Sequence, residues 1–356
     1  MESNKRNLLS KVFVCLVTGI IALGASVELS QAQNPAQLPK TIGIGTHSVG
    51  GAYHASGSAV AALVSEKTKI RAVVQPFGGP SAWMPMMQSG ELEMGLLSGF
   101  DAGAAYAGRL GYDKPNTNLR LVLCGNVVSS ISCTVLKRSG IKKLTDLKGK
   151  KVGSQYGGNK MLHNLAEAML KSVGMTWNDV VPVGVPDFRS SIRMIREGRI
   201  DCGTAGATTT PAAVELHTAL GVNVLAFGDM QPADIANGVP PDKQAILDEL
   251  VPGCFPKVAK GGVGVLEKDT VLISYPIYLA AAASLSKEAV YVILKAIWEN
   301  YSDLHPAHPW LRGWKPEGMA VGNQPAPYHD GAIKFYKDNG VWTDAMEKKQ
   351  KQLLGS

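Results

Sequence analysis

Short apolar runs alternate with segments of helical periodicity along most of this chain. The runs that predict strands are residues 41–45, 70–75, 93–97, 120–124, 131–136, 151–154, 180–184, 200–203, 222–227 and 272–279. Between them, apolar residues recur at i, i+3 and i+4, which predicts helices over 51–67, 158–173 and 211–220. This alternation is typical of an α/β protein with largely parallel sheets.

The number of predicted strands favours two sheets, because ten strands are many for one. Segments 121–136 and 271–283 are long apolar runs without glycine-rich turns, and we interpret them as crossover strands between two lobes. On this interpretation, 33–135 is the first part of lobe 1, 136–271 is lobe 2, and 272–356 returns to lobe 1 with C-terminal helices.

The first 32 residues have the pattern of an export signal. Basic residues precede the apolar run Val12–Gly24, and Ser30–Ala32 supplies the small residues of a cleavage site. The run is too short for a membrane span, which needs about 20 apolar residues. Cys15 lacks the small-residue context of a lipoprotein cysteine. We therefore expect cleavage near Ala32 and a soluble mature protein in the periplasm.

Composition and charge narrow the class of partner. The chain is 45% apolar and 18% charged, as is ordinary for a globular protein of about two domains. Removing the predicted signal takes away three basic and two acidic residues, so the formal net charge falls from +7 to +6. A modest positive field suits small anionic ligands. Lysine and arginine are dispersed and lack interleaved aromatic residues, so no nucleic acid partner is expected.

Four cysteines follow the predicted signal, namely Cys124, Cys133, Cys202 and Cys254. An oxidising compartment permits disulfides, and Cys124 with Cys133 is the only pair close in sequence. All four lie in apolar or strand-like surroundings, where buried free thiols are the commoner outcome. We expect buried thiols, with the Cys124–Cys133 disulfide as the alternative.

The stretch Thr41–His54, TIGIGTHSVGGAYH, has the glycine spacing of several kinds of site. A phosphate-binding loop needs Lys and then Ser or Thr directly after its second glycine, where this chain has Gly51 and Ala52. The dinucleotide-binding fingerprint lacks its third glycine after Gly43 and Gly45. Because both nucleotide-binding motifs lack residues that their chemistry requires, we expect no cofactor.

A serine-hydrolase elbow with Ser48 as nucleophile is the enzyme alternative. The elbow needs a small residue two positions earlier, and Thr46 would crowd its strained backbone. His305 or His329, each near an aspartate, would have to complete a triad. These histidines and His308 also lack the carboxylate spacing of a metal site, so a structural role is expected. We expect a protein that is not an enzyme and holds no metal.

Paired glycines that run into a helix favour anion binding. Gly50 and Gly51 precede the predicted helix 51–67, whose first-turn amides have no partner within the helix and carry a partial positive charge. Ser48 adds a hydroxyl donor beside them. A similar pair, Gly157 and Gly158, follows the first predicted strand of lobe 2. Each lobe therefore offers one glycine turn to a ligand between them.

On these and further motifs the chain resembles the TAXI branch of the solute-binding proteins that serve TRAP transporters. The motifs are Gly50-Gly-Ala-Tyr53, Gly78-Gly-Pro-Ser-Ala-Trp83, Gln88–Met94, Asp146–Gly153, Arg196–Asp201 and Pro327–Tyr336. The resemblance covers nearly the whole mature chain. It implies a periplasmic-binding-protein-like fold, of the two-lobed Venus flytrap class and type II-like, that closes over an organic carboxylate or amino acid.

The resemblance also implies ligand-binding residues in both lobes. In lobe 1 these are Gly50, Gly51, Tyr53, Ser81 and Asp101. In lobe 2 the corresponding turn is Tyr156, Gly157, Gly158 and Asn159, where the family usually has a Gly-Ser-Gly-Thr-like turn. This departure leaves the identity of the ligand open.

Three further residues have two interpretations each. Arg189 follows the expected helix N-cap Asp187, where its guanidinium suits a ligand carboxylate or belongs to a solvated basic face. Trp83 forms either a cleft wall or part of the core. Thr208 either contacts the ligand or only supports the start of the predicted helix 211–220. Thr210 is expected to be the N-cap of that helix.

Together these features predict an extracytoplasmic receptor that works as a monomer. Its expected partners are a small organic anion or amino acid and the membrane subunits of a TRAP transporter. A periplasmic receptor for a sensor system would use the same cleft and stays as the alternative outside enzymes.

Overall fold

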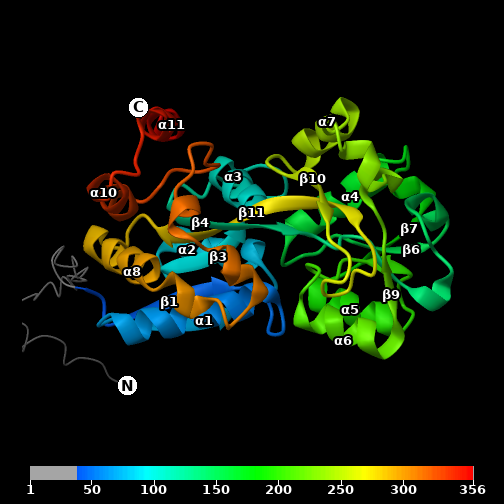
Figure 1. Cartoon of the computed structure of the whole chain (residues 1–356), viewed down its shortest axis with the longest axis horizontal. Helices are drawn as coiled ribbons and strands as arrows, with labels where there is room; N and C mark the ends of the chain where they lie inside the picture. Colours follow the sequence, from blue (N-terminus) through cyan, green and yellow to red (C-terminus); the bar gives the residue numbers. More distant parts are fainter. Residues whose placement is uncertain (1–37, 356) are drawn as a thin grey trace, which may run out of the picture. The chain divides into compact units, whose positions relative to one another are not determined.

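The computed structural model describes residues 38–355, which build two β-sheets covered by helices (Figure 1). The predicted export signal, with Cys15 and the expected cleavage site, lies outside these residues. We call the part built on the six-stranded sheet lobe 1 and the part built on the five-stranded sheet lobe 2. None of the helices within residues 38–355 is long and apolar enough to cross a bilayer. The two-sheet architecture confirms the predicted two-lobed α/β class. The expectation of largely parallel sheets is wrong, because β11 and β5 run antiparallel to their neighbours and make both sheets mixed.

Lobe 1 has the strand order β10-β11-β3-β1-β2, and β4 pairs with the other edge of β11. β1 is parallel to β2 and β3, whereas β11 is antiparallel to β3, β4 and β10. The strands are β1 (Thr41–Thr46), β2 (Arg71–Pro76), β3 (Met94–Ser98), β4 (Leu119–Ser129), β10 (Phe255–Ala259) and β11 (Thr270–Ala282). The helices are α1 (Ala52–Lys67), α2 (Pro80–Ser89), α3 (Gly99–Ala107), α8 (Lys287–Glu299), α9 (Pro316–Met319), α10 (Asp330–Asp338) and α11 (Asp344–Leu354).

Lobe 2 has the strand order β7-β6-β8-β5-β9, with parallel pairs at β6 and antiparallel pairs at β5. Its strands are β5 (Thr134–Leu136), β6 (Lys151–Ser154), β7 (Val181–Gly184), β8 (Cys202–Gly203) and β9 (Val222–Val224), and its helices are α4 (Lys160–Lys171), α5 (Phe188–Arg196), α6 (Pro211–Leu220) and α7 (Pro241–Leu250). The short 3-10 helices of the chain are η1 (Lys137–Ser139), η2 (Leu144–Leu147), η3 (Trp177–Asp179), η4 (Phe227–Asp229), η5 (Pro232–Ile235), η6 (Tyr301–Leu304) and η7 (Pro309–Gly313).

Two chain segments that connect the lobes lie side by side. β4 ends at Ser129 just before β5 of lobe 2, and β11 begins after β10 and residues 260–269 and pairs with β4. At this end the two strands are joined by a 2.8 Å hydrogen bond between the hydroxyls of Ser129 and Ser274. The Ser130 amide also donates to the carbonyl of Ile273 at 2.9 Å. Adjacent crossings are the geometry of a hinge, since a few residues there can absorb the backbone change of closure.

Local sequence signals account for most helix ends. α6 occupies the predicted residues 211–220, because Pro211 fits the first helical position and Gly221 takes a φ of +66° behind the last. Asp187 caps α5 as predicted and accepts from the Ser190 amide at 2.7 Å. β10 escaped prediction, because Pro256 argues against a strand. It is tolerated at the edge of the sheet, and it brings part of the 136–271 segment into the lobe 1 sheet.

All four cysteines in the described part of the chain are free and buried. The prediction of buried thiols is confirmed, and the Cys124–Cys133 disulfide is not formed. Burial raises the pKa of the Cys124 thiol to about 11, which makes this group unreactive at neutral pH.

Candidate functional site

The turn between β1 and α1 forms one wall of a cavity between the lobes. Gly50 has a φ of +84°, which only glycine adopts easily, and Gly51 is the extended N-cap residue of α1. No side chain caps α1, and its first turn holds no acidic residue. The first-turn amides are therefore left for another acceptor.

This interlobe cavity has a volume of about 30 Å³. A buried water needs ~10–15 Å³ by the same measure, so the cavity has room for about two waters. Four predicted ligand-binding residues line it: Gly51, Tyr53, Asp101 and Asn159. The other lining residues are His47, Ala52, Met161, Leu162, Phe188, Gly206, Ala207, Thr210, Tyr275 and Trp310. Both lobes and the crossover strand β11 therefore contribute to one small space.

Several helices begin at the cavity wall. α1, α4 and α6 contribute their N-cap residues Gly51, Asn159 and Thr210, and none of these three residues caps its own helix through its side chain. The first amide of α4, that of Lys160, instead donates to the Ser81 hydroxyl of lobe 1. α5 contributes its first residue, Phe188. Because each helix N-terminus carries a partial positive charge, their convergence favours an anionic group in the cavity.

Three buried polar atoms at the cavity have no hydrogen-bond partner in the described structure. They are Nε2 of His47, the hydroxyl of Tyr53 and Oδ1 of Asn159, on residues only 7%, 5% and 2% exposed. Leaving such a group unsatisfied costs about 1–3 kcal/mol. The cavity therefore offers both donors and acceptors to a bound molecule.

Aromatic rings hold two of these groups in place. The ring of His47 stacks on Tyr53 at 4.0 Å, and Tyr53 meets the edge of Trp310 at 5.1 Å. Burial lowers the pKa of His47 to about 3, against the opposing effect of Asp187. The imidazole is therefore neutral at physiological pH, with one nitrogen as donor and the other as acceptor.

Asp101 is the acidic residue of the cavity. Its carboxylate accepts from the hydroxyls of Ser98 at 2.6 Å and Tyr112 at 2.8 Å. Burial nevertheless raises its pKa to about 6, because the hydrogen bonds only partly offset desolvation. The described residues that line the cavity include no Lys or Arg. Any positive potential there comes from the helix N-termini.

A set of contacts around the cavity holds the lobes together, and we call it the interlobe clasp. The Ser48 hydroxyl donates to Oδ2 of Asp187 at 2.8 Å, and Arg189 donates to the carbonyl of Val49. The Lys160 amide donates to the Ser81 hydroxyl at 3.1 Å.

Glycines make the closest backbone approach in the clasp. A Cβ on Gly158 would lie 3.0 Å from Cα of Gly78, and a Cβ on Gly50 would lie 3.0 Å from Nη1 of Arg189. The predicted residues Ser48, Gly50, Ser81, Gly158 and Arg189 thus lie at the clasp and not in the cavity wall.

The remaining predicted residues lie elsewhere. Trp83 is fully buried in lobe 1, where a Cβ on Gly95 would meet its ring at 2.5 Å. Tyr156 is buried in lobe 2 and accepts from the Thr204 amide at 3.1 Å. Gly157 borders an outer groove, and Thr208 borders another beside the crossover strands.

Thr210 is the N-cap residue of α6, but its hydroxyl does not cap the helix. Oγ1 instead accepts from the Ala207 amide at 2.8 Å, and the residue lines the interlobe cavity. The sequence did not predict that Thr210 lines the cavity. It also did not predict the lining residues His47, Phe188, Tyr275 and Trp310. His47 and Phe188 adjoin residues that were singled out, whereas Tyr275 and Trp310 come from distant segments without a local motif.

His329 has a structural role, as predicted. Its Nδ1 accepts from the Gly331 amide at the start of α10, and its Nε2 lies 3.0 Å from the carbonyl of Leu285. No group of His, Cys, Asp and Glu within residues 38–355 is placed to hold a metal ion.

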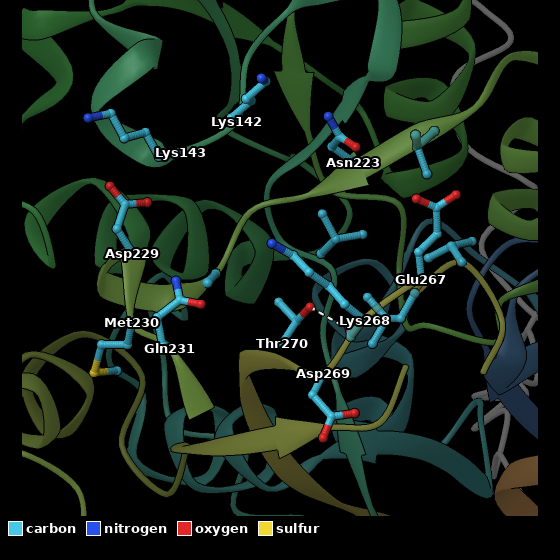
Figure 2. A pocket seen from close by; sticks show the side chains of 15 residues that line it. Lys142, Lys143, Asn223, Asp229, Met230, Gln231, Glu267, Lys268, Asp269 and Thr270 are labelled. Carbon is cyan, nitrogen blue, oxygen red and sulfur yellow. Dashed lines mark hydrogen bonds between the residues drawn. The ribbon is translucent and has the colours of Figure 1, made fainter. Parts of the chain in front are cut away.

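A second hollow lies beside β9, and we call it the β9 groove (Figure 2). Its volume is about 660 Å³, far above that of the interlobe cavity. β9, the turn of η4 and residues 265–270 form its walls, with Lys142 and Lys143 at the rim. It shares no lining residue with the interlobe cavity.

The fold defines a two-lobed α/β protein with a small cavity lined by residues of both lobes. The chain belongs to the NMT1-like family, whose sequence profile matches residues 44–340. A Haemophilus influenzae protein named "Putative thiamine biosynthesis protein" is 39% identical over 87 residues, which is 24% of this chain. The match spans 27% of that relative, so the chain aligns with about a quarter of its length.

Solved structures of solute-binding proteins are similar at low identity. The alkanesulfonate-binding protein SsuA from Xanthomonas axonopodis pv. citri is 13% identical with a TM-score of 0.47, covering 87% of this chain and 96% of its own. PhnD1 from Prochlorococcus marinus, in complex with methylphosphonate, is 10% identical with a TM-score of 0.47, covering 87% and 100%. A TctC solute-binding protein from Polaromonas is 14% identical with a TM-score of 0.42, covering 86% and 98%.

Proposed function

We propose that this protein is an extracytoplasmic solute-binding protein that captures a small organic carboxylate or amino acid between its lobes. The observation that carries the proposal is the group of three buried, unpartnered polar atoms in the interlobe cavity. A ligand that satisfied them would recover much of their desolvation cost. The N-termini of α1 and α6, which have no cap bond from their own N-cap side chains, supply the electrostatic attraction for its acidic group, and the dipole of α4 adds to it although its first amide donates to Ser81.

Delivery to a TRAP-type membrane transporter is the finer part of the proposal. It is supported by the ordered motifs of the TAXI resemblance, which begin at Gly50-Gly-Ala-Tyr53 and end at Pro327–Tyr336. Export to the periplasm is supported by the signal pattern of residues 1–32. Fractionation of cells that express the full chain tests export, and uptake of the identified ligand in a strain lacking the protein tests delivery.

Binding without turnover fits the surroundings of Ser48. Its hydroxyl donates directly to Asp187 and lies 3.2 Å from the Phe77 carbonyl, so no imidazole stands between serine and carboxylate. The adjacent His47 lines the cavity, its Nε2 has no partner among the described residues, and burial lowers its pKa to about 3. A general base for a serine nucleophile needs a pKa near the working pH.

A thermal-shift screen of residues 33–356 against small carboxylates, amino acids and neutral analogues tests the proposed function. A ligand at 100 times its Kd adds about 2.7 kcal/mol of stability, which is readily detected. We expect one chemical class to shift the Tm, with calorimetry then giving a micromolar or tighter Kd.

Asn159→Asp is the matched variant for this screen, because it keeps the size of the side chain and places a negative charge at the N-terminus of α4. It should abolish the response to anions. Ester or amide hydrolysis that disappears in Ser48→Ala would contradict the proposal and favour an enzyme.

A further inference from the structure

β9 presents a free strand edge to the β9 groove. It is the last strand of the lobe 2 sheet, and among the strands within residues 38–355 it pairs only with β5. The Leu225 amide donates to the Cys133 carbonyl, and the Lys137 amide donates to the Gly221 carbonyl. In an antiparallel ladder this alternation directs the backbone groups of Val222 and Val224 away from β5.

One of these outward groups has a partner, since the Val222 amide lies 3.4 Å from Nδ1 of His217. The carbonyl of Val222 and both backbone groups of Val224 therefore face the groove. An incoming strand could pair with them, as in β-strand addition.

Near this edge, two of the acidic side chains have ion-pair partners, whereas the lysines that line the groove have none within residues 38–355. Glu267 pairs with Lys137 and Asp269 pairs with Lys260 at 2.8 Å, and both of these lysines stand outside the groove lining. The lining lysines have no carboxylate within ion-pair distance among the described residues; they are Lys142, Lys143 and Lys268.

Figure 2 shows Lys142 and Lys143 on one side of the groove and Lys268 reaching in from the opposite side. Asp229 is the lining carboxylate without a lysine partner, and it accepts from the Leu144 amide at 2.7 Å. Asp146, outside the groove lining, also lies close to Lys142 and Lys143, whose backbone amides and charges help to lower its pKa. Three lysines therefore face two carboxylates that have no other lysine, and the groove keeps a small surplus of positive charge.

We propose that the β9 groove binds an extended acidic peptide segment of a partner protein, which adds to β9 as a further strand. Its backbone would pair with Val224, and its carboxylates would face Lys142, Lys143 and Lys268. A short, lysine-rimmed edge discourages apolar strands and other copies of this basic chain. The same charge selects an acidic strand. Because the groove and the interlobe cavity share no residue, a partner held here leaves the cavity free to exchange ligand.

The test uses a fluorescent octapeptide of alternating Val and Glu, with a Val and Lys octapeptide as its counterpart. We expect the acidic peptide alone to bind in an anisotropy titration, more weakly as salt rises to ~150 mM. The triple variant Lys142→Glu, Lys143→Glu, Lys268→Glu should lose at least ~10-fold in affinity. The matched variant Lys114→Glu, Lys315→Glu, Lys348→Glu makes the same change of net charge at exposed sites elsewhere. It should keep most of its affinity for the acidic peptide.

Amide hydrogen exchange distinguishes strand addition from loose charge attraction. The Val224 amide should gain protection when the peptide binds, whereas the Asn223 amide, which already faces β5, should change little. Binding without protection of Val224, equal loss in both triple variants, or no binding at ~1 mM peptide would each overturn the proposal. Binding of phosphatidylserine vesicles through the same lysines, with no peptide binding, would assign the groove to a membrane surface and also overturn it.

Discussion

The interlobe cavity and the β9 groove differ most in how their polar groups are satisfied. The cavity is about 30 Å³ and contains three buried polar atoms without partners. The groove is about 660 Å³, and its acidic groups are bonded to lysines or backbone amides while its free lysines face solvent. The polar groups of the β9 groove therefore lower the stability of the fold little. The interlobe cavity lowers it more, because its buried polar atoms lack hydrogen bonds.

The volume of a hollow is therefore a poor guide to whether it binds a ligand. Each unsatisfied buried group costs about 1–3 kcal/mol, so a fold seldom keeps several together without compensation. A small ligand can supply that compensation in the cavity. The groove offers only a strand edge and exposed charge, which suit a macromolecular partner and not an enclosed solute.

Gly51→Val should abolish ligand binding while the protein still folds. A Cβ at this position would lie 2.8 Å from Cζ of Phe188 and 3.1 Å from the Ser48 carbonyl oxygen. Gly51 has a φ of −88°, so valine meets no backbone strain. The added methyl groups would fill the cavity and push Phe188 away, which prevents closure. We expect a loss beyond ~100-fold in a calorimetric titration with the ligand found by the screen.

Gly157→Val is the matched control, because nothing lies within 4 Å of a Cβ built there. Its affinity should stay near that of the wild type, and circular dichroism should show both variants folded. Normal binding by Gly51→Val would place the ligand outside the interlobe cavity. A large loss in Gly157→Val would show that the second glycine turn contacts ligand, as the sequence suggested.

Asp101→Asn should change how stability depends on pH. The folded pKa of about 6 exceeds the usual value of 3.8 for an aspartate, so the native state binds its proton more tightly than the unfolded chain does. Stability from this group is present below about pH 4 and is lost as pH rises through about 6, by of order 3 kcal/mol. The variant should therefore gain stability relative to the wild type across this window, measured by urea unfolding at several pH values.

Asp269→Asn is the control from the β9 groove. Its hydrogen bond from Lys260 holds the pKa of Asp269 below its usual range, so it has no titration left between pH 4 and 6. His47 acts in the opposite sense to Asp101, since its pKa of about 3 makes stability rise with pH up to about 6.5. If the free energy of unfolding depended on pH in the same way for Asp101→Asn and for the wild type, the Asp101 carboxylate would have to be solvated in the folded protein.

Local sequence signals predicted the architecture and the helix starts well. The strands around β1 and β6, the cap at Asp187 and the start of α6 at Pro211 follow from periodicity and from residues with strong positional preferences. β10 was missed because Pro256 contradicts a strand in local terms, and only its edge position in the finished sheet permits it.

The candidate site was predictable only where it coincides with a motif. Gly51, Tyr53, Asp101 and Asn159 follow strands or glycine turns, and the fold brings them to one cavity. Trp310 reaches the same cavity from the 3-10 helix η7, far along the chain and without a motif of its own. Which residues touch across a closed interface depends on packing between lobes, and no local pattern encodes that.

Arg189→Ala should weaken ligand binding moderately by loosening the interlobe clasp. Arg189 bonds the Val49 carbonyl and is exposed, so its charge-assisted bond is worth about 1–2 kcal/mol after solvent screening. The loss should be similar for ligands of different charge, because the side chain acts on closure. X-ray scattering should show a larger radius of gyration for the variant with ligand absent. A far greater loss for dianionic ligands than for neutral analogues would instead place the guanidinium on the ligand.

Ser48→Ala should produce the smallest effect, a loss of about 0.5–1.5 kcal/mol in ligand binding. The Ser48 hydroxyl bonds Asp187 across the lobes at 2.8 Å, but Asp187 keeps its cap bond from the Ser190 amide when the hydroxyl is removed. The helix start of α5 should therefore survive, and unfolding by urea should change little. In the double variant with Arg189→Ala, the two losses should depart from additivity, because the two bonds join neighbouring residues across the same interface. Strictly additive losses in calorimetry would mean that the two residues act independently, and a loss beyond ~100-fold from Ser48→Ala alone would assign its hydroxyl to the ligand.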